Sequence, residues 1–328
     1  MLSKSRILDG LQCPKRLWLQ VHSPVLAVVA PSAAFQFQVG HKVGEVARSL
    51  YPNGRLIADK DPSAALRATE AELAQAGDKV VFEGTVQNGG VLIRADILTR
   101  KGSDVVLREV KSTTRVKKYH LPDVAVQRWT LEGAGLPVSQ SFLTHIDGTF
   151  VYGGDGRYDG LFRDVDISAD IAPLTGQVPG WVEKFSRMLD GPMPQVDTGA
   201  HCSDPFDCPF RGHCSEGAPE FPVEILPHGR KAVAALRAVG YRDLRKVPEG
   251  MLSSARHIRV WRATVTGQPD IVQGAGAELA ALPYPRYYLD FETVQMAVPI
   301  WAGTRPYEQL PFQWSCHVES GHGSMEHG

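Results

Sequence analysis

Two neighbouring stretches decide the fold of this 328-residue chain: LIRADIL at residues 92–98 and VVLREVK at residues 105–111. Both are short and apolar, with an acidic residue inside an otherwise strand-like run. A third run of this kind lies at 79–86, and turns rich in Gly, Asn and Asp join the three runs. This pattern predicts an antiparallel meander of three strands.

Helical patterns lie on both sides of this predicted meander. Ser3 and Ser5 can cap a first helix that ends near Cys13, and further helices are expected at 35–50 and 64–76. After the meander, Pro122 opens a helix that continues to Glu132 and stops at glycines, and residues 138–146 then form a strand. The order helix, three strands, helix and strand predicts an α/β core.

The acidic residues of the two deciding stretches form a candidate metal site. Glu109 and Lys111 share one face of a strand because side chains alternate, and the hairpin can bring Asp96 beside Glu109. Two carboxylates and a backbone carbonyl suit Mg²⁺ or Mn²⁺, and Lys111 can hold or activate an attacking water. An isolated Glu-x-Lys is more often a solvated hairpin edge, so two surface carboxylates and a solvated lysine are the alternative.

Gln127 lies on the helix that follows the meander. Facing the site, its amide could orient Lys111 or the water; as an exposed helical glutamine it would have no such role. An Asp inside an apolar strand just upstream, together with this glutamine, favours the interpretation as a site.

Four cysteines form a second candidate site. One precedes the meander and three follow it with five residues between neighbours: Cys13, Cys202, Cys208 and Cys214. Zinc sites prefer cysteine pairs two to four residues apart, whereas iron–sulfur clusters take four thiolates from more varied loops. His201 and His213 keep a mixed zinc site open, and unliganded thiols are a third possibility. Cys316 stands outside the pattern.

Composition limits the class of protein. Apolar residues make up 43% and charged residues 22% of the chain, as in ordinary globular proteins. The net charge of −1 means that nucleic acid would have to bind a local basic patch. We find no stretch that could span a bilayer and no secretory signal, so we expect a cytoplasmic protein without membrane contact. Five cysteines in such a protein favour metal binding or catalysis over disulfides.

Asp96, Glu109-Val110-Lys111 and Gln127 resemble, in order and spacing, the PD-(D/E)XK core of RecB-like nucleases. The early Leu2–Arg6 with Cys13-Pro14, and the late cysteine trio, resemble the iron–sulfur branch of that family. The CRISPR spacer-acquisition nuclease and the AddB nuclease domain belong to this branch. The resemblance covers roughly residues 1–216.

This resemblance implies a restriction-endonuclease-like core, stapled by a [4Fe–4S] cluster on the four cysteines, with zinc as the alternative. It also implies a histidine on an early helix that completes the Mg²⁺ or Mn²⁺ shell of Asp96 and Glu109. His41 is the best match for that histidine, and Glu45, one turn later, could replace it. The family usually has a tyrosine four residues after its glutamine; here that place is Leu131.

Basic residues follow the candidate catalytic strand at Arg115, Lys117 and Lys118, and another basic run, from Lys4 to Arg16, lies beside Cys13. Such runs are commonly solvated faces. Next to a nuclease site, they can instead follow phosphates with salt-dependent affinity.

A third motif lies near the end of the sequence, where Asp290-Phe291-Glu292 ends an apolar strand and both carboxylates share one face. It resembles the first motif of DnaQ-like (DEDD) exonucleases, in which these residues bind catalytic metal ions. No Asp follows Asp290, so we expect a truncated ribonuclease-H-like domain with an incomplete site. The predicted domains are 1–218 for the nuclease, 219–283 for a helical linker and 284–328 for the start of the exonuclease.

The sequence therefore predicts a metal-dependent nuclease that cuts single-stranded or end-containing DNA. The alternative is a non-catalytic nucleic-acid-binding protein in which the cysteine site is structural. A third possibility is a truncated exonuclease with an N-terminal targeting module.

Overall fold

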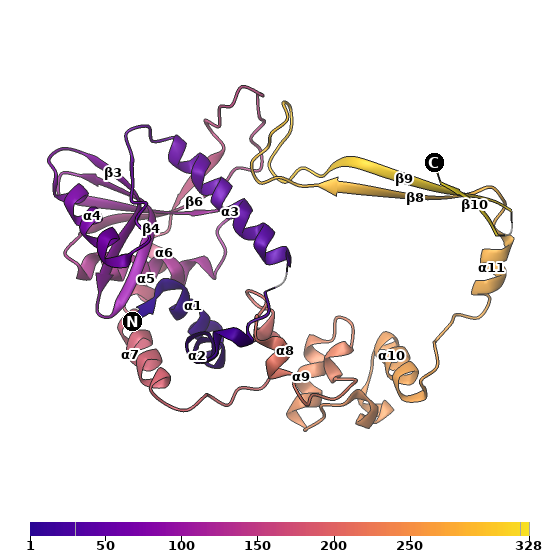
Figure 1. Cartoon of the computed structure of the whole chain (residues 1–328). Helices are drawn as coiled ribbons and strands as arrows, with labels where there is room; N and C mark the ends of the chain where they lie inside the picture. The colour runs from indigo at the N-terminus through magenta and orange to yellow at the C-terminus, as the bar shows by residue number, and fades with distance from the viewer. Residues whose placement is uncertain (30, 322, 328) are drawn as a thin grey trace. The chain divides into compact units, whose positions relative to one another are not determined.

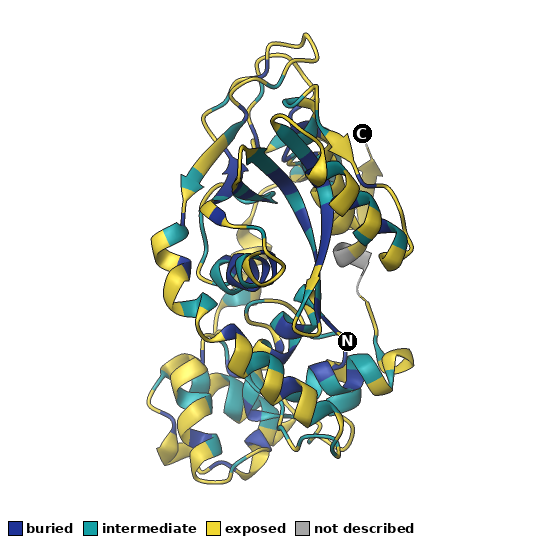
Figure 2. Cartoon of the chain, turned by 90° about the vertical axis from the view of Figure 1, so that its left-hand side faces the viewer, coloured by how far each residue is buried: buried dark blue, intermediate teal, exposed yellow. Residues whose placement is uncertain are grey.

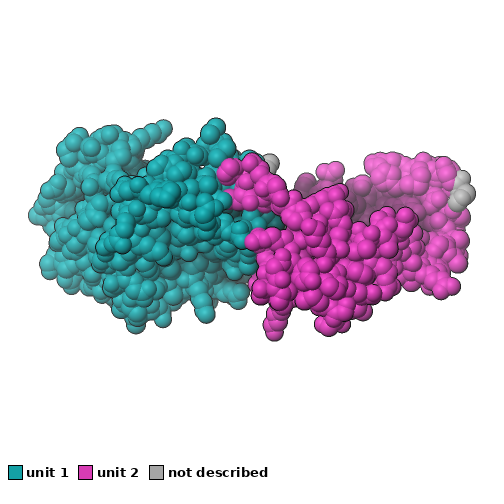
Figure 3. Space-filling view, turned by 90° about the horizontal axis from the view of Figure 1, so that it is seen from below, with its two compact units in different colours: residues 1–211, 293–310 teal, residues 212–292, 311–328 magenta. Residues whose placement is uncertain are grey.

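The computed structural model describes residues 1–29, 31–321 and 323–327, and the chain divides into two compact units (Figure 3). The first unit contains Met1–Arg211 and Thr293–Leu310. The second contains Gly212–Glu292 and Pro311–Gly328. Each unit is described by itself below. The described part of the chain has no helix that is both long and apolar enough to span a bilayer.

A mixed sheet forms the centre of the first unit (Figure 1). Its strands, in spatial order, are β2 (Arg55–Leu56), β3 (Lys79–Asn88), β4 (Val91–Lys101), β5 (Asp104–Lys111), β6 (Val138–Ile146) and β7 (Phe162–Asp166). A short β1 (Leu2–Ser3) pairs in parallel with β4. The β3-β4-β5 meander is antiparallel, as predicted, and β6 runs parallel to β5. The α/β fold class is therefore confirmed, whereas β1, β2 and β7 were not predicted.

Helices surround this sheet. They are α1 (Lys4–Gln12), α2 (Pro14–His22), α3 (Pro31–Ser49), α4 (Pro62–Ala74), α5 (His120–Gly133), α6 (Ser168–Thr175) and α7 (Val178–Leu189). The predicted cap of the first helix is present, because the Ser3 side chain accepts a hydrogen bond from the Arg6 backbone N–H at 3.3 Å. Asp61 caps α4 in the same way through the Ala64 N–H. The caps fix where these helices begin.

Two helices pack on opposite faces of the sheet. Gln127 of α5 reaches Glu109 on one face of β5, whereas Val110, which points to the other face, packs in a cluster with Val43 and Val46 of α3. Strand alternation thus separates a polar site under α5 from an apolar contact under α3. Figure 2 shows the central strands of the sheet as largely buried, and Glu109 on β5 is among the buried residues.

A segment late in the chain completes the first unit. Ala297 and Val298 are buried in the same cluster as Val43, Val46, Ile146 and Leu161. The Tyr307 hydroxyl donates a hydrogen bond to the Ser112 carbonyl, one residue after Lys111. Residues 293–310 therefore belong to the core of the first unit, although they are distant in sequence.

The second unit contains short helices and a small sheet. Its longer helices are α9 (Arg230–Ala238), α10 (Ala255–Thr266) and α11 (Ala275–Ala281). A small apolar core forms from Val223, Leu226, Leu236, Leu244, Val247 and Leu252. The strands β8 (Arg286–Val294), β9 (Leu310–Gly321) and β10 (Ser324–His327) form a sheet in the order β10-β9-β8, and β10 is antiparallel to β9. The strand predicted to begin at Arg286 is present, and most of its side chains are exposed.

Candidate active site

A local irregularity in the sheet turns Asp96 toward β5. The pairing of β4 with β5 ends at Ile97 and Arg108. On the other side of β4, strand β3 pairs Phe82 with Ile97 and Gly84 with Ala95. Between those two pairs Glu83 has a φ of 55°, which is uncommon for a residue other than glycine. Irregular pairing of this kind re-aims side chains. The Asp96 Oδ2 atom accepts a hydrogen bond from the Val110 N–H at 2.7 Å.

Glu109 is the centre of the site and is 2% exposed. Its Oε1 accepts from the Lys111 Nζ at 2.5 Å and from the Lys4 Nζ at 3.0 Å. Its Oε2 accepts from the Gln127 Nε2 at 2.7 Å. A buried carboxylate is costly unless it is paired in this way, so these three donors offset the cost of burying the Glu109 side chain.

Asp123 joins the same network from α5. Its carboxylate accepts from the Lys111 Nζ at 2.7 Å and from the Gln127 Nε2 at 2.9 Å, and it lies 3.1 Å from the Lys4 Nζ. Asp123 and Gln127 are four residues apart on a helix and therefore share one face. The structure thus brings together four predicted site residues, Asp96, Glu109, Lys111 and Gln127, and adds two more, Asp123 and Lys4.

The sequence contained a signal for one of the added residues. This residue is Asp123. It lies one helical turn before Gln127, so the two side chains share the helix face that meets the strands. Lys4 had no such signal, because it is 105 residues from Glu109. In the sequence Lys4 belongs only to a basic run, and pairing over that distance depends on the tertiary fold.

The charges of the network determine which groups stay ionised. Burial lowers the pKa of Lys111, but the carboxylates of Glu109 and Asp123 outweigh it, and the pKa lies well above its ordinary value. For Asp123, burial raises the pKa, but Lys4 and Lys111 outweigh it and hold the pKa well below its usual range. Lys111 is therefore a cation at neutral pH and can donate hydrogen bonds, but it cannot take a proton.

Asp96 behaves differently. Burial, followed by the negative charge of Glu109, raises the pKa of Asp96 to about 7. Its contact with the Val110 N–H and the charges of the two lysines only partly offset these effects. Near neutral pH the carboxyl is thus divided between its protonated and ionised forms, and a cation bound beside it would favour the ionised form.

Two buried histidines lie next to the network. Burial and then the charge of Lys111 lower the pKa of His120 to about 4, so its ring is neutral at pH 7. Its Nδ1 accepts a hydrogen bond from the Lys117 N–H at 3.2 Å. His145 is opposite Lys111 in the β5–β6 register. Neither histidine was predicted as part of the site.

A divalent cation fits the donor set in three respects. Mg²⁺ is commonly held by one or two carboxylates and keeps several waters, and Asp96 and Glu109 supply two carboxylates from adjacent strands. The network has three acidic and two basic side chains, so negative charge is in excess when all are ionised. Moreover, the Gln127 Oε1 is buried and has no hydrogen-bond partner, an acceptor that a water or ion ligand would satisfy. Among the described residues, however, no three His, Cys, Asp or Glu side chains form a ready metal cage.

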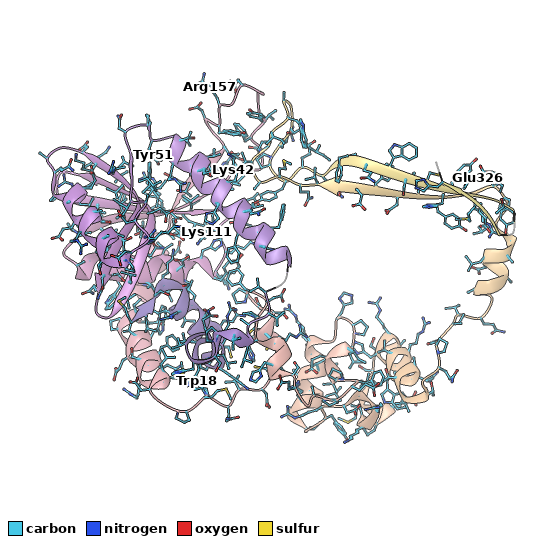
Figure 4. The ribbon with its side chains drawn as sticks, in the orientation of Figure 1. Trp18, Lys42, Tyr51, Lys111, Arg157 and Glu326 are labelled. Atoms are coloured by element: carbon cyan, nitrogen blue, oxygen red, sulfur yellow. The ribbon has the colours of Figure 1, made fainter. Side chains whose placement is uncertain are left out.

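The other predicted site residues lie on α3 and on β8. His41 and Glu45 are exposed on α3, and Glu45 pairs with Lys42 at 3.1 Å. Figure 4 labels Lys42 on this helix. Asp290 and Glu292 are exposed on β8 in the second unit.

The predicted basic residues lie in the loop between β5 and α5. Arg115 and Lys118 are exposed, and the half-buried Lys117 places its Nζ 5.6 Å from the centre of the Tyr119 ring. The loop directly follows Lys111, so these cations are close in sequence to the network.

Three of the four predicted cysteine ligands come together in the first unit. Burial raises the pKa of the Cys208 thiol, and the neighbouring thiols of Cys202 and Cys13 raise it further. Gln12, next to Cys13, donates to the carbonyls of His201 and Phe206 at 2.7 and 2.6 Å. The two ends of the predicted nuclease domain therefore meet near Cys13.

The remaining two cysteines are assigned to the second unit. Cys214 is assigned to the second unit, at the end of the short α8 (Arg211–Cys214), and Cys316 is half-buried on β9. The five cysteines form no disulfide.

Comparison with known proteins shows two similarities and one search without a match. A family model described as a domain of unknown function (DUF2779) matches residues 287–328, a part that includes β9, β10 and nearly all of β8. No curated protein matches the chain. A solved structure described as "Crystal structure of SSO0001" is similar, with 15% identity over 54% of this chain and 73% of that chain. Its TM-score is 0.27, which carries no conclusion about fold or function.

Proposed function

We propose that the first unit is a divalent-metal-dependent nuclease that hydrolyses phosphodiester bonds of DNA. The observation that carries the proposal is the meeting of Asp96, Glu109, Lys111 and Gln127 in one buried network on adjacent elements. Buried charges are costly, and a protein retains them in a cluster chiefly where they act. The composition of this cluster suits phosphoryl chemistry, because it combines hard oxygen ligands with fixed cations.

The two carboxylates would hold Mg²⁺ or Mn²⁺. Such an ion, when bound, supplies Lewis acidity and lowers the pKa of a bound water. Gln127 fixes the carboxylates of Glu109 and Asp123 through one amide nitrogen, which keeps both in a single orientation. Asp123 in turn holds the ammonium of Lys111 at 2.7 Å.

Lys111 would act as a donor. Its raised pKa keeps it charged at neutral pH, so its role is to orient the attacking water and to stabilise negative charge on the phosphate. The nearby Arg115, Lys117 and Lys118 would contact the backbone phosphates of the same nucleic acid.

The cysteines would hold a [4Fe–4S] cluster that closes the nuclease domain. Cys13, Cys202 and Cys208 converge from both ends of the first unit, which supports a shared ligand. The Gly199 N–H lies 3.5 Å from the Cys202 sulfur, and hydrogen bonds to sulfur are common around such clusters. Cys214 enters as the fourth ligand on its sequence spacing alone.

Cleavage of labelled DNA with Mn²⁺ tests the proposal. Protein purified without oxygen should cut single-stranded or end-containing DNA, and Asp96→Ala should abolish the cleavage. Asp159→Ala removes an exposed carboxylate and serves as the matched control, which should retain full activity. If the wild-type protein binds DNA but cuts neither DNA nor RNA with Mg²⁺ or Mn²⁺, the non-catalytic binding protein is the correct interpretation.

A further inference from the structure

Lys4 is held at the site by rigid surroundings. It is the first residue of α1, whose cap Ser3 belongs to the short β1, and β1 is paired with β4 through Leu2 and Val91. One turn later on the same helix, Ile7 is fully buried in the main core. The backbone of Lys4 is therefore fixed on both sides, and its ammonium reaches the site from a defined position.

The ammonium of Lys4 shares a carboxylate oxygen with that of Lys111. The Lys4 Nζ is 3.0 Å from the Glu109 Oε1, and the Lys111 Nζ is 2.5 Å from the same atom. Lys4 also lies 3.1 Å from the Asp123 Oδ1, whereas Lys111 is 2.7 Å from the Asp123 Oδ2. Lys4 makes the longer contact with each carboxylate and is thus the more easily displaced of the two cations.

An ion held by Glu109 would compete with this ammonium. Asp96 Oδ2 already accepts from a backbone N–H, and Glu109 Oε2 already accepts from Gln127. The Oε1 of Glu109 is the oxygen at which both ammonium groups meet, so a cation that binds there displaces one of them or lies beside both. Like charges a few ångströms apart repel strongly where water is largely excluded.

We propose that Lys4 is an internal counter-ion that competes with the divalent cation for Glu109 and so weakens the metal affinity of the site. Without the ion, Lys4 keeps the buried carboxylates of Glu109 and Asp123 neutralised. With the ion bound, Lys4 gives up Glu109 and retains Asp123 as its partner. This inference rests on the proposed function for the presence of a divalent cation at Glu109.

Titration of the 328-residue chain with Mn²⁺, followed by the electron paramagnetic resonance signal of the free ion, tests the proposal. Lys4→Ala and Lys4→Gln should each bind Mn²⁺ about tenfold more tightly than wild type, or tighter, because a unit positive charge has left the site. Lys4→Arg keeps the charge and should give no gain. Arg6→Ala, on the same helix, removes a cation that contacts the Met1 carbonyl and should leave the affinity unchanged.

The outcomes separate this inference from the proposed function. Equal or weaker Mn²⁺ binding by both neutral variants, with wild type binding normally, overturns the role of Lys4 and leaves the nuclease proposal intact. If the two neutral variants bind Mn²⁺ and the wild-type protein binds none, the result supports the role of Lys4. No binding by any variant overturns both. Lys4→Gln keeps an N–H donor for Glu109. This variant can therefore still test the proposal if Lys4→Ala fails to fold.

Discussion

Asp96 links the pH of the medium to the stability of the protein. Its pKa is raised from an ordinary value near 4 to about 7, so between these values the folded state binds more protons than the unfolded chain. Stability is therefore full below about pH 4 and is lost as the pH rises toward about 7. This loss is specific to the metal-free protein, because a bound cation favours the ionised carboxylate.

Asp96→Asn should remove this dependence. At pH 8 the metal-free variant should be more stable than wild type by about 1–2 kcal/mol, a figure reduced from the full linkage value because the side chain is only half-buried. Near pH 4 the two proteins should unfold alike. Urea unfolding at the two pH values measures the difference, and an equal gain at both would point to a cause other than titration.

Lys111 gives a kinetic prediction at the same scale. Lys111→Ala should lower the cleavage rate per bound complex by about a hundredfold or more, because the fixed donor beside the reacting phosphate is lost. Mn²⁺ binding should be retained, since the carboxylates remain. Single-turnover kinetics measures the rate, and Lys42→Ala, which breaks an exposed pair with Glu45, is the control. A variant that loses only DNA affinity would make Lys111 a phosphate contact.

The network also shows how far sequence patterns extend. Asp96, Glu109 and Lys111 were predictable because strand alternation and a hairpin fix their neighbourhood within a few residues. The place of Lys4 was not predictable, because the pairing of β1 with β4 and the packing of α1 depend on contacts across the whole unit. Nor does a sequence pattern contain a signal for the positive φ of Glu83 beside Asp96.

At the scale of elements, α1 joins the two candidate sites. Lys4 at its first residue contacts the carboxylates, and Cys13 follows its last residue, with its N–H bonded to the Asp9 carbonyl at 2.8 Å. A shift of this helix would move both ends together. The packing of α1 therefore influences both the carboxylate network and the cysteine group.

Gly10 on α1 allows a test of this packing. A Cβ at this position would lie 2.8 Å from a ring carbon of Phe185 and 2.9 Å from a methyl of Leu17, both fully or almost fully buried. Gly10→Ala should therefore destabilise the protein by about 1–3 kcal/mol despite the better helix propensity of alanine. Gly180→Ala on α7 meets no atom within 4 Å and should be neutral or slightly stabilising. Thermal unfolding compares the two variants, and equal stabilities would show that α1 is loosely packed.

The cysteine group gives a second prediction for elements. If Cys13 is a ligand that ties α1 to the loop at 201–208, Cys13→Ser should cost far more stability than Cys316→Ser. Protein purified without oxygen should be brown, with iron and sulfide in nearly equal amounts. Colourless protein with stoichiometric zinc would show that the cysteines bind zinc and not an iron–sulfur cluster. The link between α1 and the loop at 201–208 would remain. Equal losses for the two serine variants would argue against Cys13 as a ligand.

At the scale of the whole molecule, the second unit carries a carboxylate pair of its own on β8. Both Asp290 and Glu292 are exposed there. Replacing both with alanine should leave Mn²⁺-dependent cleavage by the 328-residue chain almost unchanged. A large loss of cleavage in this double variant, with normal thermal unfolding, would show that the pair contributes to a working site.

The order of elements in space was only partly predictable at this scale. The meander, α5 and β6 follow from local periodicity, and the strand at Arg286 follows from its apolar run. The return of residues 293–310 into the first unit could not be predicted, because Ala297 and Val298 carry no signal for the partners that bury them. Burial by distant residues is a property of the folded chain.

The return of residues 293–310 also means that the first unit is encoded in two separate stretches of the gene, with most of the second unit between them. A protein fragment that ends at residue 211 would expose the apolar surface of Ile146 and Leu161, which Ala297 and Val298 otherwise cover. Recombination at a single breakpoint between the units would therefore transfer an incomplete core. The two units are thus constrained to be inherited together, and neither can be exchanged as an independent cassette.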